Sequence, residues 1–431
     1  MTEIDRYRHI AFSAPDAIRE VQENRLREHL TYCREHSPYY RRILINSGVD
    51  LGSITLDQLS GLPFTEKSDI EQYNDDFCAV PPAKIVDIVL SSGTTGRPTR
   101  LMYTDYDLQR LAYNEEKSFE GCGITADDTV LLTCTMDRCF VAGLAYFLGI
   151  RSLGAAAIRN GLNSLESHRD IIERMDPTVM VGVPTFLRKL GLYLQAIGID
   201  PAKTAVSKLV CIGEPLRDKD LALLEVGDDL QNIWQAKTFS TYASSEIVTT
   251  FCECTSQQGG HLHPDLAVVE IVNENGTVLP PGTTGEVVVT PMAVEGMPLV
   301  RFRTGDMSFL INTPCSCGRF SARLGPILGR RKQMMKIRGT TLYPQAVYSV
   351  LEELNAVSEY YIMVTSESDL SDSMTVYAAV NDMSCTADTI QDRLQARLRV
   401  KPAVVITDEE TIKQQVYTPK SRKPVHFIDR R

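Results

Sequence analysis

Hydrophobic positions recur at helical spacing in the first part of the chain. Residues 15–45 combine Arg, Glu, Leu and Tyr in this pattern, and Ser37 with Pro38 interrupts it. Residues 55–75 follow, where Thr65 is expected to cap a helix. This part of the sequence therefore predicts helical segments, the first of them broken before residue 45.

From about residue 85 to residue 300, short β-branched runs alternate with amphipathic helical stretches. The runs expected to form strands include residues 85–90, 129–133, 178–183 and 208–212. Alternation of this kind predicts parallel sheets covered by helices. Residues 266–290 differ, because apolar runs flank a Pro-Pro-Gly turn, and this pattern predicts an antiparallel meander.

A polar run at residues 329–333 precedes a shorter pattern of strands and helices that continues to residue 431. The fold class expected from the whole pattern is α/β. A large N-terminal domain, residues 1–329, would hold parallel sheets flanked by helices together with a β-rich subdomain. Residues 334–431 would form a small α+β domain.

Composition narrows the function classes. The formal net charge of −10 over 431 residues argues against a nucleic-acid-binding protein. No apolar run approaches the roughly 20 residues that a membrane helix needs, and the charged first residues do not resemble a secretion signal. The eleven scattered cysteines suggest reduced thiols rather than a disulfide framework. We therefore expect a cytoplasmic protein without membrane or nucleic-acid partners.

The stretch from Leu90 to Arg100 is the strongest local indication of function. It carries two glycines, several hydroxyl groups and two arginines, and it follows an expected strand. Loops at the carboxyl ends of strands are common sites for nucleotide phosphates. The Gly-Lys-Ser/Thr ending of a Walker loop is absent. A plain polar turn is the alternative interpretation when this stretch is taken alone.

Further motifs follow this loop in a characteristic order. They lie at residues 212–215, 241–246, 301–306, 329–339 and 419–423. Their order and spacing resemble the acyl-adenylate-forming superfamily, specifically its phenylacetate–CoA ligase-like branch, over nearly the whole chain. The resemblance implies that residues 1–329 bind ATP and the acyl group, that residues 330–333 form a hinge, and that the small C-terminal domain is mobile. Lys332 occupies a hinge position where the branch more often has Asp.

The resemblance also implies a nucleotide site. Its phosphate loop would consist of Ser92, Gly93, Thr94, Thr95 and Gly96. Tyr242 would pack near the adenine, and the turn of Gly213, Glu214 and Pro215 would line its other side. Ala243, Ser244 and Ser245 would also belong to the nucleotide site. Ala243 stands where the branch usually has Gly. Asp306 would accept the ribose hydroxyls, and Arg330 would reach ribose or phosphate. Glu246 would be the ligand of Mg²⁺, which suits a hard carboxylate oxygen.

A lysine of the C-terminal motif is implied to bridge carboxylate and phosphate during adenylation. Lys423 aligns with this position. The motif is one residue shorter than usual, so Lys420 remains a rival. A solvated basic tail is the alternative interpretation of this cluster.

Cysteine and histidine residues gather in three short segments. A closed Cys₃His set is typical of structural zinc, and the branch carries a similar arrangement that matches Cys254, His261, Cys315 and Cys317. Cys252 and His263 are then left as rivals or bystanders. Scattered buried cysteines are the alternative.

Residues 136–144 lie where the branch builds its acyl pocket. The expected pocket residues are Arg138, Phe140, Ala142 and Gly143. Phe140 and Ala142 suit an aryl group, whereas Arg138 and Cys139 depart from the phenylacetate pattern. The expected reaction is ATP-dependent activation of a small, aromatic carboxylic acid to acyl-AMP, followed by transfer to coenzyme A. The alternatives are transfer to a carrier-protein thiol or an amine, and a non-catalytic nucleotide-binding homologue. The resemblance also allows a homodimer.

Overall fold

The computed structural model describes residues 6–45, 48–91, 99–337, 340–368, 371–382, 384–417 and 424–431. The chain divides into two compact units. The first unit comprises Met1–Thr304 and Ser308–Ile327, and the second comprises Gly305–Met307 and Leu328–Arg431. Within the described ranges, no helix is both long enough and apolar enough to cross a membrane.

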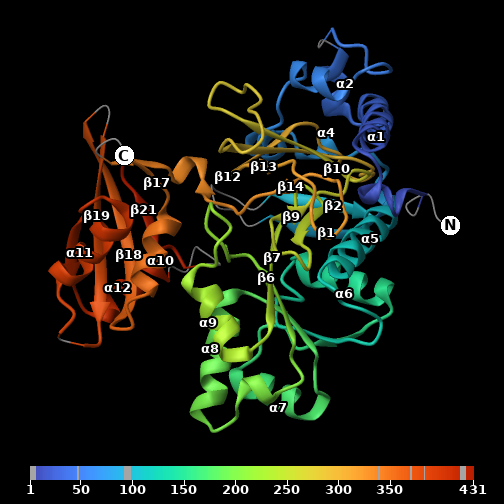
Figure 1. Cartoon of the computed structure of the whole chain (residues 1–431). Coiled ribbons are helices and arrows are strands. Elements are labelled where there is room, and N and C mark those ends of the chain that lie inside the picture. Colours follow the sequence, from blue (N-terminus) through green and yellow to red (C-terminus); the bar gives the residue numbers. More distant parts are fainter. Residues whose placement is uncertain are drawn as a thin grey trace. The chain divides into compact units, whose positions relative to one another are not determined.

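The first unit contains the elements that precede residue 328 (Figure 1). Its helices are α1 (Pro15–His36), α2 (Pro38–Ile45), α3 (Lys67–Gln72), α4 (Asn74–Phe77), α5 (Asp105–Gly121), α6 (Ala142–Leu153), α7 (Leu165–Met175), α8 (Pro184–Ala196) and α9 (Glu225–Trp234). Its strands are β1 (Ile85–Leu90), β2 (Arg100–Thr104), β3 (Thr129–Leu132), β4 (Ala156–Arg159), β5 (Val179–Gly182), β6 (Lys208–Ile212), β7 (Lys237–Ser244), β8 (Thr249–Glu253), β9 (Gly260–His261), β10 (Ala267–Val272), β11 (Gly285–Pro291), β13 (Leu310–Ile311) and β14 (Arg323–Leu324). Strand β12 (Phe302–Ser308) contributes residues to both units.

A mixed sheet forms the centre of the first unit. Its order over the described residues is β13-β14-β9-β8-β7-β6-β5-β3-β4. The strands from β4 to β7 pair in parallel, whereas β7, β8, β9, β14 and β13 pair antiparallel. The expectation of parallel strands alternating with helices is therefore confirmed for the segment from β3 to β7, and the added antiparallel strands make the sheet mixed.

The inner parallel strands β3, β5 and β6 are buried on both faces, and successive side chains of each strand point to opposite faces of the sheet. Val181 packs in a cluster with Phe119 of α5 and Tyr146 of α6. Its neighbour Met180 packs in another cluster, with Leu190 of α8 and other side chains of α8 and α9. Figure 1 shows these helix pairs on either side of the sheet. Short runs without polar alternation are thus explained by burial on two sides.

The glycine-rich loop connects β1 and β2, which form a two-stranded antiparallel sheet. The expected strand at 85–90 is confirmed, but it lies outside the parallel sheet. Val86 and Ile88 on one face of β1 are more than half exposed. This face of β1 is therefore open to solvent, unlike the faces of the inner parallel strands. The expected meander is also confirmed, since β10 pairs antiparallel with β11 in register Val269 to Val289.

The helical N-terminal segment has the expected break, because α1 ends at His36 and α2 begins at Pro38. The expected N-cap at Thr65 is wrong. Glu66 is the N-cap of α3 and forms a capping box with Asp69. Thr65 instead makes a parallel bridge to Phe302, the first residue of strand β12, and this tertiary pairing overrides its local capping preference.

The second unit has an α+β architecture. Its elements are β15 (Gly329–Arg330), β16 (Met335–Ile337), β17 (Thr340–Leu342), α10 (Pro344–Glu352), β18 (Val357–Ser368), β19 (Ser371–Val380), α11 (Ala387–Leu398), β20 (Ala403–Ile406), α12 (Glu409–Val416) and β21 (Phe427–Asp429). The sheet order is β20-β19-β18-β21. Helices α10 and α11 share a core with one face of this sheet, and α12 packs on the other. Together the two units confirm the expected α/β fold class.

Candidate active site and metal centre

The glycine-rich loop is held at its base by the residues that flank it. The Ser91 N–H donates to the Thr99 carbonyl at 2.9 Å, and the Thr99 N–H donates to the Ser91 hydroxyl at 3.0 Å. These two hydrogen bonds therefore hold the residues on either side of the loop, Ser91 and Thr99, next to each other. The loop residues expected to contact phosphate lie outside the described residues: Ser92, Gly93, Thr94, Thr95 and Gly96.

The expected adenine-lining turn follows β6. Gly213 has φ +76°, in the left-handed region that favours glycine. The carboxylate of Glu214 accepts two hydrogen bonds from Thr185, from its hydroxyl at 2.9 Å and its N–H at 3.1 Å. The sequence assigned Glu214 to the nucleotide, whereas the structure shows its side chain bound to helix α8.

The segment that carries Tyr242 and Glu246 leaves the strand next to β6. Ile212 pairs with Thr241 in parallel register, so the loops after β6 and β7 emerge at the same edge of the sheet. Tyr242 is half-buried, and its ring is stacked 6.3 Å from that of Phe251. The structure thus brings the two segments that are expected to bind the nucleotide to neighbouring strands. Ala243 and Ser244 pair with β8.

Glu246 lies in a sheltered polar network. One carboxylate oxygen accepts a hydrogen bond from the Ser244 hydroxyl, and the other lies 3.6 Å from Nζ of Lys67. The preceding carbonyl, of Ser245, accepts a hydrogen bond from the Tyr103 hydroxyl at 2.8 Å. The Glu246 side chain is 12% exposed, and its hard oxygens are the type of ligand that Mg²⁺ takes. Glu246 is therefore one candidate ligand for Mg²⁺, with the Lys67 ammonium beside the same carboxylate.

Lys67 and Tyr103 were missed at the sequence level. Lys67 begins helix α3 and Tyr103 lies on β2, so their local patterns indicate only a helix start and a buried strand. The Tyr103 contact spans 142 residues of sequence. Hydrophobic periodicity and capping rules carry no information on such long-range pairs.

Asp306 and Arg330 lie together in the second unit. They are register partners on β12 and β15, and Nε of Arg330 lies 3.3 Å from Oδ1 of Asp306. Asp306 is buried, whereas the Arg330 side chain is 42% exposed. A carboxylate can accept hydrogen bonds from both hydroxyls of a diol, so the geometry is compatible with the expected ribose contact.

The expected acyl-pocket residues lie on a tight loop and the start of α6. Arg138 and Cys139 both have positive φ, 60° and 54°, which is uncommon for side chains with a Cβ. The Leu90 N–H donates to the Cys139 carbonyl at 2.9 Å, so this loop is tied to the strand that leads into the glycine-rich loop. Phe140 is 37% exposed, and Ala142 begins α6. Gly143 follows it, where a Cβ would lie 2.3 Å from the Thr135 carbonyl oxygen.

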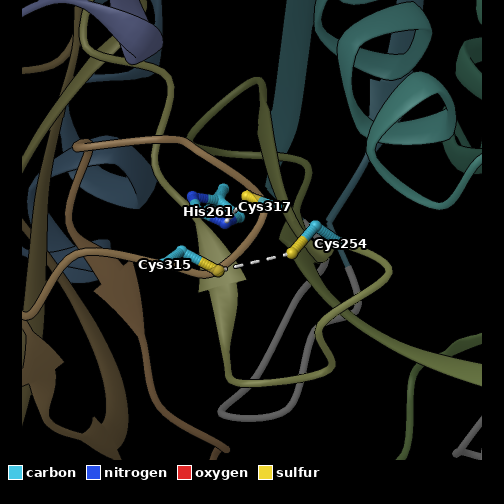
Figure 2. A group of neighbouring side chains, drawn as sticks. All are labelled: Cys254, His261, Cys315 and Cys317. Atoms are coloured by element: carbon cyan, nitrogen blue, oxygen red, sulfur yellow. Dashed lines mark hydrogen bonds between the residues drawn. The ribbon is translucent and has the colours of Figure 1, made fainter.

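Cys254, His261, Cys315 and Cys317 converge in the first unit (Figure 2). Their ligand atoms all lie within 4.8 Å of one another. The two sulfurs of Cys254 and Cys315 are 3.6 Å apart, and Sγ of Cys317 lies 3.4 Å from Nε2 of His261. A tetrahedral zinc with bonds near 2.3 Å would separate its sulfur ligands by about 3.8 Å. The cluster therefore fits a closed zinc site.

Groups around the cluster orient its ligands. Nδ1 of His261 lies 3.2 Å from the Ser321 hydroxyl, which leaves Nε2 facing Cys317. Burial lowers the pKa of His261 to about 3, with a smaller contribution from the charge of Arg319. Burial raises the pKa of the Cys254 thiol to about 12. The histidine is thus neutral near pH 7, and metal binding would have to displace thiol protons.

The two leftover residues have other contacts. Sγ of Cys252 lies 3.4 Å from Sγ of Cys122 and 3.1 Å from the Thr241 hydroxyl. The ring of His263 lies 3.4 Å from the Ser118 hydroxyl. The grouping described above contains neither of them, which favours the four expected ligands.

Lys420 and Lys423 lie outside the described residues. Lys332 lies in a short 3₁₀ turn, Arg331–Gln333, at the start of the second unit. The hinge and the catalytic lysine therefore stay predictions.

Comparison with known proteins agrees with these features. The sequence matches the AMP-binding enzyme family over residues 45–294 and the AMP-binding enzyme C-terminal domain over residues 339–431. A phenylacetate-coenzyme A ligase of Thermus thermophilus is 32% identical over 364 residues, covering 83% of this chain and 80% of that protein. A phenylacetate-coenzyme A ligase of Escherichia coli is 27% identical over 419 residues, covering 94% and 92%.

A solved structure of 2-hydroxyisobutyryl-CoA ligase in the postadenylation state has the same fold. Its TM-score is 0.82 at 22% sequence identity, and the match covers 96% of this chain and 89% of that one. The family match extends over more than half of the chain, and the expected family is confirmed. This protein belongs to the AMP-binding enzyme family.

Proposed function

We propose that this protein activates a small carboxylic acid with ATP and transfers the acyl group to coenzyme A. A carboxylate oxygen attacks the α-phosphorus, and pyrophosphate leaves to give the acyl-AMP. The coenzyme A sulfur then attacks the acyl carbon, the thiol proton is lost, and AMP leaves. The enzyme class, an AMP-forming acid–thiol ligase, is supported by the family match and by the CoA ligases among the relatives.

The reaction brings together two anions, so the site must offset negative charge. Glu246 would hold Mg²⁺, which when bound supplies positive charge to the phosphate oxygens. The Lys67 ammonium lies 3.6 Å from the same carboxylate, so Mg²⁺ would compete with it for Glu246. The loop fixed at Ser91 and Thr99 would surround the outer phosphates with hydroxyl and amide donors. Lys423 would bridge carboxylate and α-phosphate in the first half-reaction.

The adenosine would be held by the remaining predicted residues. Tyr242 and the turn at Gly213–Pro215 would line the adenine, because they leave adjacent strands at one edge of the sheet. Asp306 would accept the ribose hydroxyls, with Arg330 beside it. These roles rest on the family resemblance together with the positions of the strands.

The acid is proposed to be small and aromatic. Phe140 and Ala142 offer apolar surface at the start of α6, next to the loop tied to β1. Arg138 is 71% exposed in its side chain and gives this loop a positive charge. Arg138 and Cys139 both have positive φ, which gives this loop a backbone shape that is uncommon for residues with a Cβ.

The Cys₃His cluster is proposed to bind one structural zinc. Four protein ligands leave no open position for substrate, so such an ion stabilises the fold and takes no part in the chemistry. It would join the segment after β8 and strand β9 to the loop at 315–317, which are far apart in sequence.

The observation that carries the proposed function is the placement of the Glu246 loop and the Gly213 turn on paired strands. The test is ATP–pyrophosphate exchange with a panel of carboxylic acids, aromatic and aliphatic, followed by thioester formation with coenzyme A. Exchange with an aromatic acid and thioester formation with coenzyme A alone are expected. Exchange without thioester would favour a carrier protein or an amine as acceptor, and absence of exchange with every acid would contradict catalysis.

A further inference from the structure

Helix α8 begins without a cap from its own sequence. Its N-cap residue is Val183, which has no side-chain acceptor, and Pro184 occupies the first helical position. The first N–H groups of a helix have no partner within the helix, and a side chain at the N-cap normally accepts one of them. The 13-residue helix α8 therefore needs an acceptor from elsewhere in the fold.

Glu214 supplies this acceptor from the turn after β6. Its Oε2 accepts the Thr185 N–H at 3.1 Å, and its Oε1 accepts the Thr185 hydroxyl at 2.9 Å. A carboxylate at a helix N-terminus is also favoured by the helix dipole. Glu214 therefore caps helix α8 from another loop of the same chain.

The same turn is fixed again three residues later. Nε of Arg217 donates to Oε1 of Glu253 at 2.8 Å, and both side chains are buried. The Arg217 Nη1 also donates to the Leu221 carbonyl at 3.2 Å. The segment from Gly213 to Arg217 is thus held at both ends, by an outer contact to α8 and by a buried contact to β8.

We infer that Glu214 is a positioning residue for nucleotide binding, which acts through Thr185 and not by touching ATP. This inference rests on the proposed function of the Gly213–Pro215 turn. The bidentate contact directs the negative charge of Glu214 to the N-terminus of α8 and fixes the backbone of the turn in the position where adenine would pack. Loss of the contact should loosen the turn and weaken recognition of the base.

The test uses equilibrium binding of ATP and of GTP to the full-length protein, which needs no acid substrate. Glu214→Ala is expected to raise the Kd for ATP by about tenfold, the effect of one lost charged hydrogen bond, and to narrow the preference for ATP over GTP. Glu214→Gln keeps an oxygen acceptor for the Thr185 N–H and should restore most of the affinity. Thr185→Val should weaken ATP binding less than Glu214→Ala does, and the double variant should bind no worse than Glu214→Ala.

Asp408 provides a matched control in the second unit. Its carboxylate accepts the Thr411 N–H at 2.8 Å and the Thr411 hydroxyl at 2.6 Å at the start of α12, which is the same bonding pattern in cis. Asp408→Ala should lower thermal stability by an amount similar to Glu214→Ala but leave both Kd values unchanged. Equal effects of Asp408→Ala and Glu214→Ala on ATP binding would overturn the inference.

Two further outcomes also decide against it. An unchanged Kd for ATP in Glu214→Ala would show that the contact between Glu214 and Thr185 does not position the turn. Fully additive losses in the double variant would show that Glu214 acts on the nucleotide directly. Failure of the wild-type protein to exchange pyrophosphate while it binds ATP would contradict the proposed reaction and leave the binding comparison intact.

Discussion

The ammonium group of Lys67 lies 3.6 Å from Oε1 of Glu246, and both side chains are at least three-quarters buried. Lys67 starts helix α3, whereas Glu246 follows β7. The pair therefore connects the N-terminal helical segment to the central sheet. An ammonium group and a divalent cation would compete for the same carboxylate, so this ion pair should affect the requirement for Mg²⁺.

Glu246→Gln tests this carboxylate as the magnesium ligand. The change preserves shape but removes the negative charge, so we expect pyrophosphate exchange to fall by on the order of 10²-fold or more and the Mg²⁺ concentration for half-maximal rate to rise. Glu295→Gln is the matched control, because it removes the carboxylate of another long-range ion pair, 3.4 Å from Lys84. Equal Mg²⁺ dependence in both variants would contradict the assignment.

Metal analysis tests the Cys₃His cluster. Protein purified without added metal should contain about one equivalent of zinc, because a closed set of four ligands binds tightly. Cys315→Ser should lose the metal and unfold at a lower temperature. Cys385→Ser, which changes a buried cysteine in the core of the second unit, should keep the zinc. A metal content that is unaffected by Cys315→Ser would indicate scattered thiols.

Glu115 predicts a pH dependence of stability. It is 1% exposed on α5, its Oε1 accepts a hydrogen bond from the Thr250 hydroxyl, and its Oε2 has no hydrogen-bond partner among the described residues. Burial raises the pKa of this carboxyl from 4.5 to about 8. Gly149 permits this close packing, since a Cβ there would lie 2.2 Å from Cβ of Glu115.

A raised carboxyl pKa means that the folded state binds a proton more tightly than the unfolded state. Stability from this group is fully present below about pH 4.5 and is lost as the pH rises through 8. Glu115→Gln should therefore exceed the wild type in free energy of unfolding at pH 8.5 by on the order of 2 kcal/mol, with a smaller difference at pH 5. Urea titrations at both pH values measure this, and Glu20→Gln, exposed on α1, is the control. A constant difference between wild type and Glu115→Gln would refute the assignment.

Separate assays of the two half-reactions distinguish the roles of Lys423 and Lys420. Lys423→Ala should reduce acyl-AMP formation by on the order of 10²-fold or more, the scale for removal of one electrostatic stabiliser, and should leave thioester formation from supplied acyl-AMP largely intact. Lys420→Ala is the internal control. Loss of adenylation in Lys420→Ala alone would reassign the catalytic residue, and no loss in either variant would exclude a catalytic tail.

The sequence pattern predicts those helices and strands whose formation depends on the burial and periodicity of neighbouring residues. The apolar runs at β3, β5 and β6 were recognisable because burial on both faces removes polar residues. Thr65 was assigned wrongly, since its bridge to Phe302 depends on a strand more than two hundred residues away. The antiparallel pairing of β1 was also not predicted, because the hydrophobic pattern of one strand does not indicate which strand pairs with it.

The candidate site shows the same division. The resemblance selected Cys254 and His261 over Cys252 and His263, and the structure groups the selected residues. The sequence did not predict the partner residues Lys67, Tyr103 and Thr185, because a single Lys, Tyr or Thr forms no recognisable motif. Their roles became visible only when the fold placed them against Glu246, Ser245 and Glu214.

Because the cysteines differ in exposure, their labelling rates can report on ligand binding. Of the eleven, Cys139 is exposed, Cys78 and Cys317 are partly exposed, and the others are buried. Cys139 lies in the loop tied to β1, between the acyl-pocket candidates Arg138 and Phe140. A maleimide dye should therefore label this thiol first in the native protein, and slower labelling in the presence of a given acid would reveal occupancy of the pocket without any turnover.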